Sequence, residues 1–155
     1  MLSIACDNWH LDADGNGDFQ TLSGRVALVV DDNTDSLLLT SLILEEYEVQ
    51  VMTATSASEA LEVIRQFKPD FLISDIAMPG EDGYSLIRKI RTLPPLQGGL
   101  IPAVALTAYA RDEECSFALE SGFQIYFAKP VEPTELVTAV AKLLVGDRSN
   151  KVMAQ

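Results

Sequence analysis

Polar side chains with the potential for phosphate and metal chemistry stand where apolar runs of strand length end. Asp31 and Asp32 follow "VALVV", Asp75 ends "DFLISD", Thr107 ends "PAVALT", and Lys129 follows "QIYFA". Carboxylates that are packed together repel one another, which raises the pKa of at least one of them unless a cation is present. Mg²⁺ prefers such oxygen ligands and keeps other positions for water or a substrate phosphate. The acids therefore predict the protein's share of the ligands in a magnesium site.

Each of these residues has a simpler interpretation when it is taken alone. An aspartate after a strand is most often a helix cap or a turn former, and a threonine in a strand is usually an ordinary β-branched residue. A lone lysine is usually a surface residue. The adjacent Asp31 and Asp32 are harder to explain in this way, because Asn33 or Thr34 can cap the helix that follows. The combination favours a functional site.

The chain that must position these residues alternates strand-length apolar runs with segments of helical period. We expect strands at 26–30, 49–54, 70–75, 102–107 and 124–128, and helices at 36–47, 58–67, 84–90, 114–122 and 134–145. Strands that are apolar on both faces indicate a parallel sheet with right-handed helical crossovers. The predicted fold class is α/β, a doubly wound five-stranded parallel sheet. In such a sheet the ligand site lies beyond the carboxyl ends of the strands, where the polar residues fall.

The pattern divides the chain into three parts. Residues 1–24 lack apolar periodicity and predict a flexible acidic head, residues 25–145 form the folded domain, and residues 146–155 form a short frayed tail. The stretch 12–23 has the spacing of an EF-hand calcium loop at Asp12, Asp14, Asn16, Gly17 and Asp18, but Ser23 stands in place of the bidentate glutamate. Calcium binding and a solvated acidic linker therefore remain alternatives.

Composition narrows the class of protein. The 155 residues are 48% hydrophobic, and 11 basic against 23 acidic side chains give a net charge of −12, which argues against nucleic-acid binding. No apolar run approaches the roughly 20 residues of a membrane span. The two cysteines, Cys6 and Cys115, give little support for a disulfide framework. We expect a cytoplasmic protein that contacts neither nucleic acid nor membrane.

Four motifs resemble the response-regulator receiver domains of two-component signalling. They are "VVDDN", "DIAMPGEDGYSLIRKIR" from Asp75, "LTA" at Thr107 and "AKPVEPTEL" around Lys129. The resemblance covers about residues 25 to 145 and implies the CheY-like, flavodoxin-like fold with strand order 2-1-3-4-5. It also implies a signalling domain that takes up one phosphoryl group instead of turning over a substrate. We expect either a receiver that stands alone or a piece of a larger hybrid kinase.

The resemblance implies a role for each site residue. Asp75 would accept the phosphoryl group from a histidine kinase or a phosphotransfer protein. Mg²⁺ would be held by Asp31, Asp32, Asp75 and the backbone carbonyl of Ala77. Lys129 would pair with the phosphoryl oxygens, and Thr107 and Tyr126 would form the conformational switch that a downstream effector protein reads.

Two other functions remain open. A degenerate receiver could bind partners without phosphorylation, in which case Asp75→Asn would leave signalling intact. Phosphatases similar to haloacid dehalogenases also use an aspartyl nucleophile and Mg²⁺ on a related sheet. Their nucleophile lies on the first strand in an Asp-x-Asp pattern, whereas here adjacent acids end the first strand and Asp75 ends the third. The order of the motifs disfavours the phosphatase.

Overall fold

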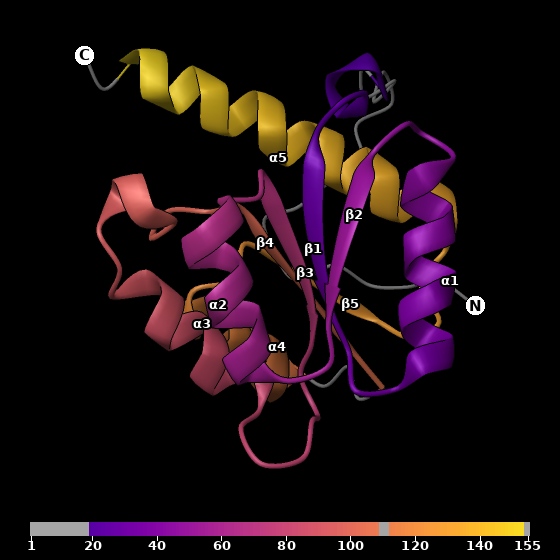
Figure 1. Cartoon of the computed structure of the whole chain (residues 1–155), viewed down its shortest axis with the longest axis vertical. Helices are drawn as coiled ribbons and strands as arrows, with labels where there is room; N and C mark the ends of the chain where they lie inside the picture. Colours follow the sequence, from indigo (N-terminus) through magenta and orange to yellow (C-terminus); the bar gives the residue numbers. More distant parts are fainter. Residues whose placement is uncertain (1–18, 109–111, 154–155) are drawn as a thin grey trace.

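The computed structural model describes residues 19–108 and 112–153. They form a five-stranded parallel sheet in the order β2-β1-β3-β4-β5, which confirms the predicted fold class and strand order (Figure 1). The strands are β1 (Val26–Val30), β2 (Gln50–Ala54), β3 (Phe71–Asp75), β4 (Ala103–Thr107) and β5 (Ile125–Ala128). Every expected strand is present, and the bounds differ from the expected ones by at most a residue.

Helices cover both faces of the sheet. They are α1 (Thr34–Glu45), α2 (Ala57–Phe67), α3 (Gly83–Arg91), α4 (Asp112–Ser121) and α5 (Pro133–Met153), with the 3-10 helices η1 (Phe19–Leu22) and η2 (Pro95–Gln97). Helices α1 and α5 pack on one face, and α2, α3 and α4 pack on the other (Figure 1). This three-layer arrangement explains why the central strands are apolar on both faces.

Successive residues of β1 belong to different cores. Ala27 and Val29 pack with the α1 and α5 side, while Leu28 and Val30 pack with the α2, α3 and α4 side. Strand side chains alternate between the two faces, so a slip of one residue would exchange the two sets. The register between β1 and β3, which aligns Val30 with Ser74, is therefore strongly specified.

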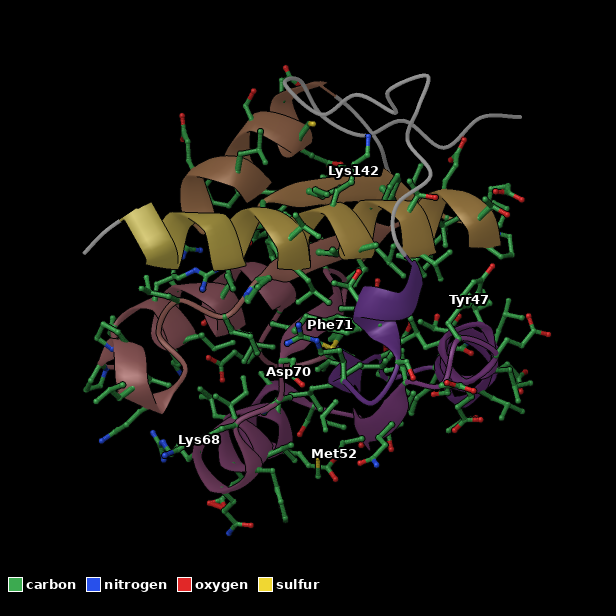
Figure 2. The ribbon with its side chains drawn as sticks, turned by 90° about the horizontal axis from the view of Figure 1, so that it is seen from above. Tyr47, Met52, Lys68, Asp70, Phe71 and Lys142 are labelled. Atoms are coloured by element: carbon green, nitrogen blue, oxygen red, sulfur yellow. The ribbon has the colours of Figure 1, made fainter. Side chains whose placement is uncertain are left out.

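The amino ends of β1 and β3 are tied together by Asp70 (Figure 2). Its Oδ2 accepts a hydrogen bond from the Val26 backbone N–H at 2.8 Å, and its Oδ1 lies 3.8 Å from the Arg25 guanidinium. Fixing the register at this end also fixes which residues are neighbours at the opposite, carboxyl end. There Asp31 follows β1 beside the end of β3.

Capping side chains and a terminal glycine define the ends of three helices, and the cap at Asn33 is one that the sequence predicts. The Asn33 side chain accepts from the Ser36 N–H at the start of α1, and the Ser56 side chain accepts from the Glu59 N–H at the start of α2. Gly122 follows α4 with φ of 132°, a left-handed conformation that favours glycine. Because Asn33 caps α1, neither of the two preceding aspartates is needed for that purpose.

The folded part begins earlier than the sequence pattern indicated. The helix η1 begins at Phe19, and Leu22 is 0% exposed in the core beside α5. The expectation of a flexible head through residue 24 is wrong for these residues, because one short apolar turn gives no periodicity and yet can be buried. Residues 1–18, which hold most of the stretch with EF-hand spacing, lie outside the described residues, so calcium binding and an acidic linker stay alternatives. Ser23 donates a hydrogen bond to Glu48 Oε1 at 2.7 Å.

The last helix ends later than expected. Helix α5 continues to Met153, whereas the loss of apolar periodicity predicted an end at Val145 and a frayed tail from residue 146. Polar residues such as Arg148 and Lys151 have good helix propensity, and extending an existing helix adds a hydrogen bond for each residue. Periodicity reports the buried face of a helix and not its length.

The cysteine expectation is also corrected. Cys115, which lies on α4, is disulfide-bonded, whereas little in the sequence favours a disulfide; Cys6 lies outside the described residues. Among the helices that the structure describes, none has both the length and the apolar character needed to cross a bilayer.

Candidate functional site

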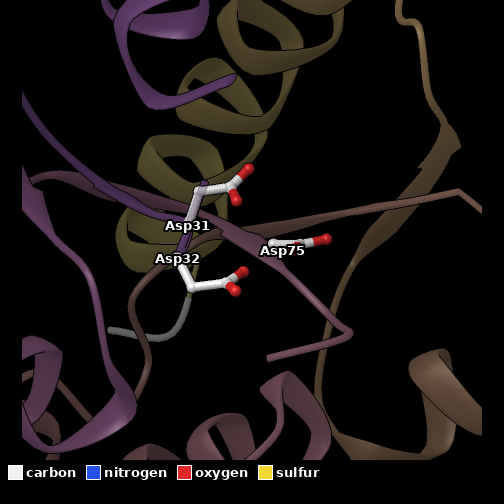
Figure 3. Close-up of side chains that lie close together, drawn as sticks. All are labelled: Asp31, Asp32 and Asp75. Atoms are coloured by element: carbon white, nitrogen blue, oxygen red, sulfur yellow. The ribbon is translucent and has the colours of Figure 1, made fainter. Parts of the chain in front are cut away.

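Three carboxylates meet at the carboxyl ends of β1 and β3. Asp31 and Asp32 follow β1, Asp75 ends β3, and one carboxylate oxygen from each lies within 4.8 Å of the others. Figure 3 shows the three side chains extending toward the same side of the sheet. Asp31 and Asp75 are buried, with 3% and 7% of their surface exposed, while Asp32 is exposed. The predicted cluster of acids is therefore present.

Lys129 brings positive charge to these acids from the end of β5. Its ammonium Nζ lies 2.9 Å from Asp31 Oδ2 and 3.3 Å from Asp75 Oδ1. Its backbone N–H donates to the Thr107 carbonyl at 2.7 Å, and a cis peptide bond joins it to Pro130. One ammonium thus pairs with two of three carboxylates, and the cluster keeps an excess of negative charge.

The electrostatics of Asp75 and Lys129 reflect this imbalance. Burial raises the pKa of the Asp75 carboxyl, and the nearby charge of Asp31 raises it further, which outweighs the opposing effect of Lys129. Burial acts to lower the pKa of Lys129, but its hydrogen bond with Asp31 and the two carboxylate charges raise the pKa overall. A bound cation would relieve the repulsion that Asp75 experiences.

The turn after β3 holds Asp75 in place. The Ile76 N–H donates to Asp75 Oδ1 at 2.9 Å, and the Gly83 N–H donates to the Ile76 carbonyl at 2.8 Å. A Cβ atom on Gly83 would lie 2.5 Å from the Asp75 carbonyl oxygen and 2.9 Å from Ile76 Cα. Only glycine allows α3 to begin this close to the end of β3.

Thr107 and Tyr126 lie together beside the acids. Thr107 ends β4, and Tyr126 on β5 is 1% exposed and points into the core that α2, α3 and α4 cover. Burial raises the pKa of the Tyr126 phenol, while a hydrogen bond with Thr107 acts in the opposite direction. The structure thus places the tyrosine ring inward and in contact with the threonine hydroxyl.

Further residues join this region that sequence reasoning did not single out. A cavity of about 470 Å³ adjoins the site, lined by Ile76, Ala77, Met78, Asp82, Tyr84, Thr107 and Glu114. Ala77, one of the predicted residues, is exposed on the loop after β3. Tyr84 and Glu114 come from helices whose position cannot be inferred from residue spacing. Their only sequence signal is that Tyr84 directly follows the "EDG" turn after the third strand.

The donor set fits Mg²⁺. Two oxygens on opposite sides of one Mg²⁺ lie about 4.2 Å apart, because each Mg–O distance is roughly 2.1 Å. The three carboxylate oxygens lie within 4.8 Å of one another, close to the span of one such site. The ligands would be Asp31, Asp32 and Asp75, all hard oxygen donors, with the remaining positions left to water or phosphate.

The sequence profile of the response regulator receiver domain matches residues 27–141. The chain belongs to this family. Receiver domains are signalling domains of two-component systems, and this one is homologous to the receivers found in histidine kinases and in response regulators. A 14.6 kDa uncharacterized protein of Leptolyngbya boryana is 46% identical over 121 residues, which cover 78% of this chain and 91% of that protein.

Solved receiver structures have the same fold. A putative response regulator from Chloroflexus aurantiacus is 36% identical with a TM-score of 0.74, over 78% of this chain and 98% of that one. The receiver domain of a sensor histidine kinase from Pseudomonas aeruginosa, which has a magnesium ion coordinated in its active site cleft, is 27% identical with a TM-score of 0.72, over 79% and 98% of the two chains. Some curated relatives are much longer, and the chain spans 14% of a sensor histidine kinase that it matches.

Proposed function

We propose that this receiver accepts a phosphoryl group on Asp75 in a Mg²⁺-dependent reaction, from a histidine kinase or a phosphotransfer protein. The observation that carries the proposal is the position of the buried Asp75 carboxylate, which lies within 4.8 Å of two further acids and 3.3 Å from the Lys129 ammonium. A nucleophile between a metal site and a cation is suited to phosphoryl transfer, where catalysis is mostly positioning and charge stabilisation.

The metal would be held by Asp31, Asp32, Asp75 and the backbone carbonyl of Ala77. When bound, Mg²⁺ neutralises charge on the phosphoryl oxygens and orients the group for in-line transfer. Asp31 is itself oriented, because its Oδ1 accepts the Asn33 N–H at 2.9 Å and its Oδ2 faces Lys129. These contacts keep the carboxylate ready to bind a metal.

In the transfer step, a carboxylate oxygen of Asp75 attacks the phosphorus of a phosphohistidine. An O–P bond forms while the N–P bond breaks, and the imidazole leaves with the electron pair and takes a proton from water. Lys129 pairs with a phosphoryl oxygen through a charge-assisted hydrogen bond. The product is an acyl phosphate formed once per chain, so the protein acts as a stoichiometric acceptor.

The added charge would act on Thr107 and Tyr126. The Thr107 hydroxyl would turn to donate to a phosphoryl oxygen, and Tyr126 would adjust as the threonine moves. Phosphorylation then shifts a two-state equilibrium by its differential interaction with the two states. The partner that recognises this change would be a protein, because the charge of −12 disfavours binding to nucleic acid or an anionic membrane. We expect the two proteins to meet in the cytoplasm.

Intact mass spectrometry after incubation with acetyl phosphate or phosphoramidate tests this function. With Mg²⁺ we expect a gain of one phosphoryl group, which EDTA and Asp75→Asn abolish. Asp35→Asn, an exposed change in the first turn of α1, is the matched control and should gain the group. No gain with either donor would contradict the proposal, and continuous turnover of phosphate esters would favour the phosphatase alternative.

A further inference from the structure

Tyr84, on the first turn of α3, makes polar and aromatic contacts with α4. Its hydroxyl donates to the Glu114 backbone carbonyl at 3.4 Å. Its ring meets the Phe117 ring edge to face, with centroids 4.5 Å apart, and the Arg88 guanidinium lies 5.3 Å from the centre of the same Phe117 ring. Glu114 and Phe117 are three residues apart and so share one face of α4. Tyr84 therefore links α3 to that face.

The Tyr126 phenol reaches the same point from β5. Its hydroxyl donates to Glu114 Oε1 at 3.4 Å. Thr107 and Tyr84 also lie close enough to the Tyr126 phenol for their hydroxyls to act on its pKa. Burial raises the pKa of both phenols, so both keep their protons at neutral pH and remain donors.

Each of these hydroxyls has one proton, which limits how the group can be satisfied. One arrangement gives every hydroxyl an acceptor: Thr107 faces Tyr126, Tyr126 shares its one proton between Tyr84 and Glu114 Oε1, and Tyr84 donates to the Glu114 carbonyl. This relay runs from the edge of the acid cluster to the first turn of α4. Tyr84 is the member that connects the strand residues to the helix.

The bonds to Glu114 are long. Hydroxyl donors usually lie about 2.7 to 2.8 Å from their acceptors, whereas both bonds here measure 3.4 Å. Long bonds are weak, so the relay can open at small cost when Thr107 turns away. It suits an element that must switch between two arrangements.

We propose that Tyr84 is a positioning residue, which holds the Tyr126 phenol inward and ties it to α4 through the Glu114 carbonyl. The proposal rests on the proposed function, in which Thr107 and Tyr126 respond to phosphorylation of Asp75. When Thr107 turns to the phosphoryl group, Tyr126 loses its donor, and Tyr84 passes the rearrangement on to α4. The hydroxyl of Tyr84 carries this coupling, and its ring only packs.

Fluorine NMR on the full chain labelled with 3-fluorotyrosine tests the inward position directly. The chain has four tyrosines, so each resonance can be assigned by a tyrosine-to-phenylalanine variant. Tyr84→Phe keeps the ring against Phe117 and removes only the hydroxyl. We expect the Tyr126 resonance of the unphosphorylated protein to move toward its solvent-exposed position, with the ratio of inward to outward populations reduced roughly 2- to 13-fold, the effect of one net hydrogen bond.

Tyr47→Phe is the matched control, because Tyr47 packs on the opposite face of the sheet (Figure 2). It should leave the Tyr126 resonance unchanged. An unchanged Tyr126 resonance in Tyr84→Phe would overturn the proposal. This experiment uses no phosphodonor, so its outcome does not depend on whether Asp75 accepts a phosphoryl group.

A second measurement tests the coupling to α4. It follows the response of α4 to phosphorylation, which would not change if Tyr84 only packed against its neighbours. After treatment with acetyl phosphate and Mg²⁺, Tyr84→Phe should gain the phosphoryl group to the same stoichiometry as the wild type, while the change in hydrogen exchange of α4 peptides becomes smaller. An equal α4 response in both proteins would overturn the coupling. No mass gain in the wild type would instead defeat the proposed function, and the Tyr126 resonance would still decide the positioning role.

Discussion

At the scale of single residues, the site is a set of charges that do not balance. Lys129 contacts Asp31 and Asp75, and the exposed Asp32 adds a third carboxylate. Unpaired buried charge is costly in a folded protein. We expect this arrangement to destabilise the metal-free fold and the same repulsion to favour the binding of a divalent cation.

Asp75→Asn should stabilise the metal-free protein at pH 7, by on the order of 1 kcal/mol. The raised pKa of Asp75 means that the folded state binds this proton more tightly than the unfolded chain does. Stability is therefore lost as the pH rises from the ordinary value of 3.8 through the raised pKa. An asparagine does not ionise and avoids this loss. Urea unfolding in EDTA at pH 7 and below pH 3.8 measures the difference in the free energy of unfolding between Asp75→Asn and the wild type.

The advantage of Asp75→Asn should disappear at the lower pH, where the carboxyl is protonated in both states. Glu62→Gln, an exposed change on α2, is the control and should alter stability by less than about 0.5 kcal/mol. If Asp75→Asn were no more stable than the wild type at pH 7, the site would not carry the repulsion described.

The site residues at strand ends can be predicted from the sequence, whereas the site residues on helices cannot. Asp31 and Lys129 follow strands and Asp75 ends one, and parallel strands bring their carboxyl ends to one edge of the sheet. Tyr84 and Glu114 reach the site from α3 and α4, whose rotation and tilt depend on side-chain packing between three elements. No spacing rule along the chain encodes that packing.

At the scale of elements, Gly83 sets how closely α3 approaches β3. Gly83→Ala should destabilise the fold by roughly 1 to 3 kcal/mol, because the new Cβ would meet backbone atoms of Asp75 and Ile76 that cannot move independently. It should also lower the rate of phosphorylation by displacing Asp75. Lys89→Ala on the same helix is the control, with an expected change within about 0.5 kcal/mol. Equal urea midpoints for Gly83→Ala and the wild type would refute this account of the turn.

Arg91 joins the end of α3 to two neighbouring loops. Its guanidinium donates to the Gly122 carbonyl at 2.7 and 3.0 Å and to the Gly99 carbonyl at 3.0 Å. Burial lowers the pKa of this guanidinium. Arg91→Lys should cost about 1 to 3 kcal/mol in the free energy of unfolding, since an ammonium cannot reach all these acceptors. Arg65→Lys, a change at an exposed position of α2, should alter the free energy of unfolding little. An equally small loss for Arg91→Lys would show that the three hydrogen bonds of Arg91 do not stabilise the fold.

The bounds of the interior elements follow from the sequence better than the ends of the chain do. Interior strands and helices are limited by caps such as Asn33 and by turns such as that at Gly122. Near the ends, η1 is one apolar turn, and the sequence of residues 146–153 has no apolar periodicity. The sequence alone therefore predicts a flexible head over η1 and a frayed tail at the end of α5.

At the scale of the whole molecule, Mg²⁺ should stabilise the fold by linkage. A ligand that binds only the folded state adds about 2.7 kcal/mol at a concentration of 100 times its Kd. We expect Tm to rise with MgCl₂ in the wild type and to rise less in Asp75→Asn, which loses one charged ligand. NaCl at equal ionic strength is the control. An equal rise in both proteins would exclude Asp75 from the metal site.

The residue that carries the phosphoryl group decides whether Asp75 is the acceptor. The protein is incubated with acetyl phosphate and Mg²⁺ and then reduced with sodium borohydride, which converts an aspartyl phosphate into homoserine. Peptide mass spectrometry locates that residue. The account predicts homoserine at position 75 and nowhere else, and none when Mg²⁺ is omitted. Homoserine at another acidic position, or none in the complete reaction, would contradict it.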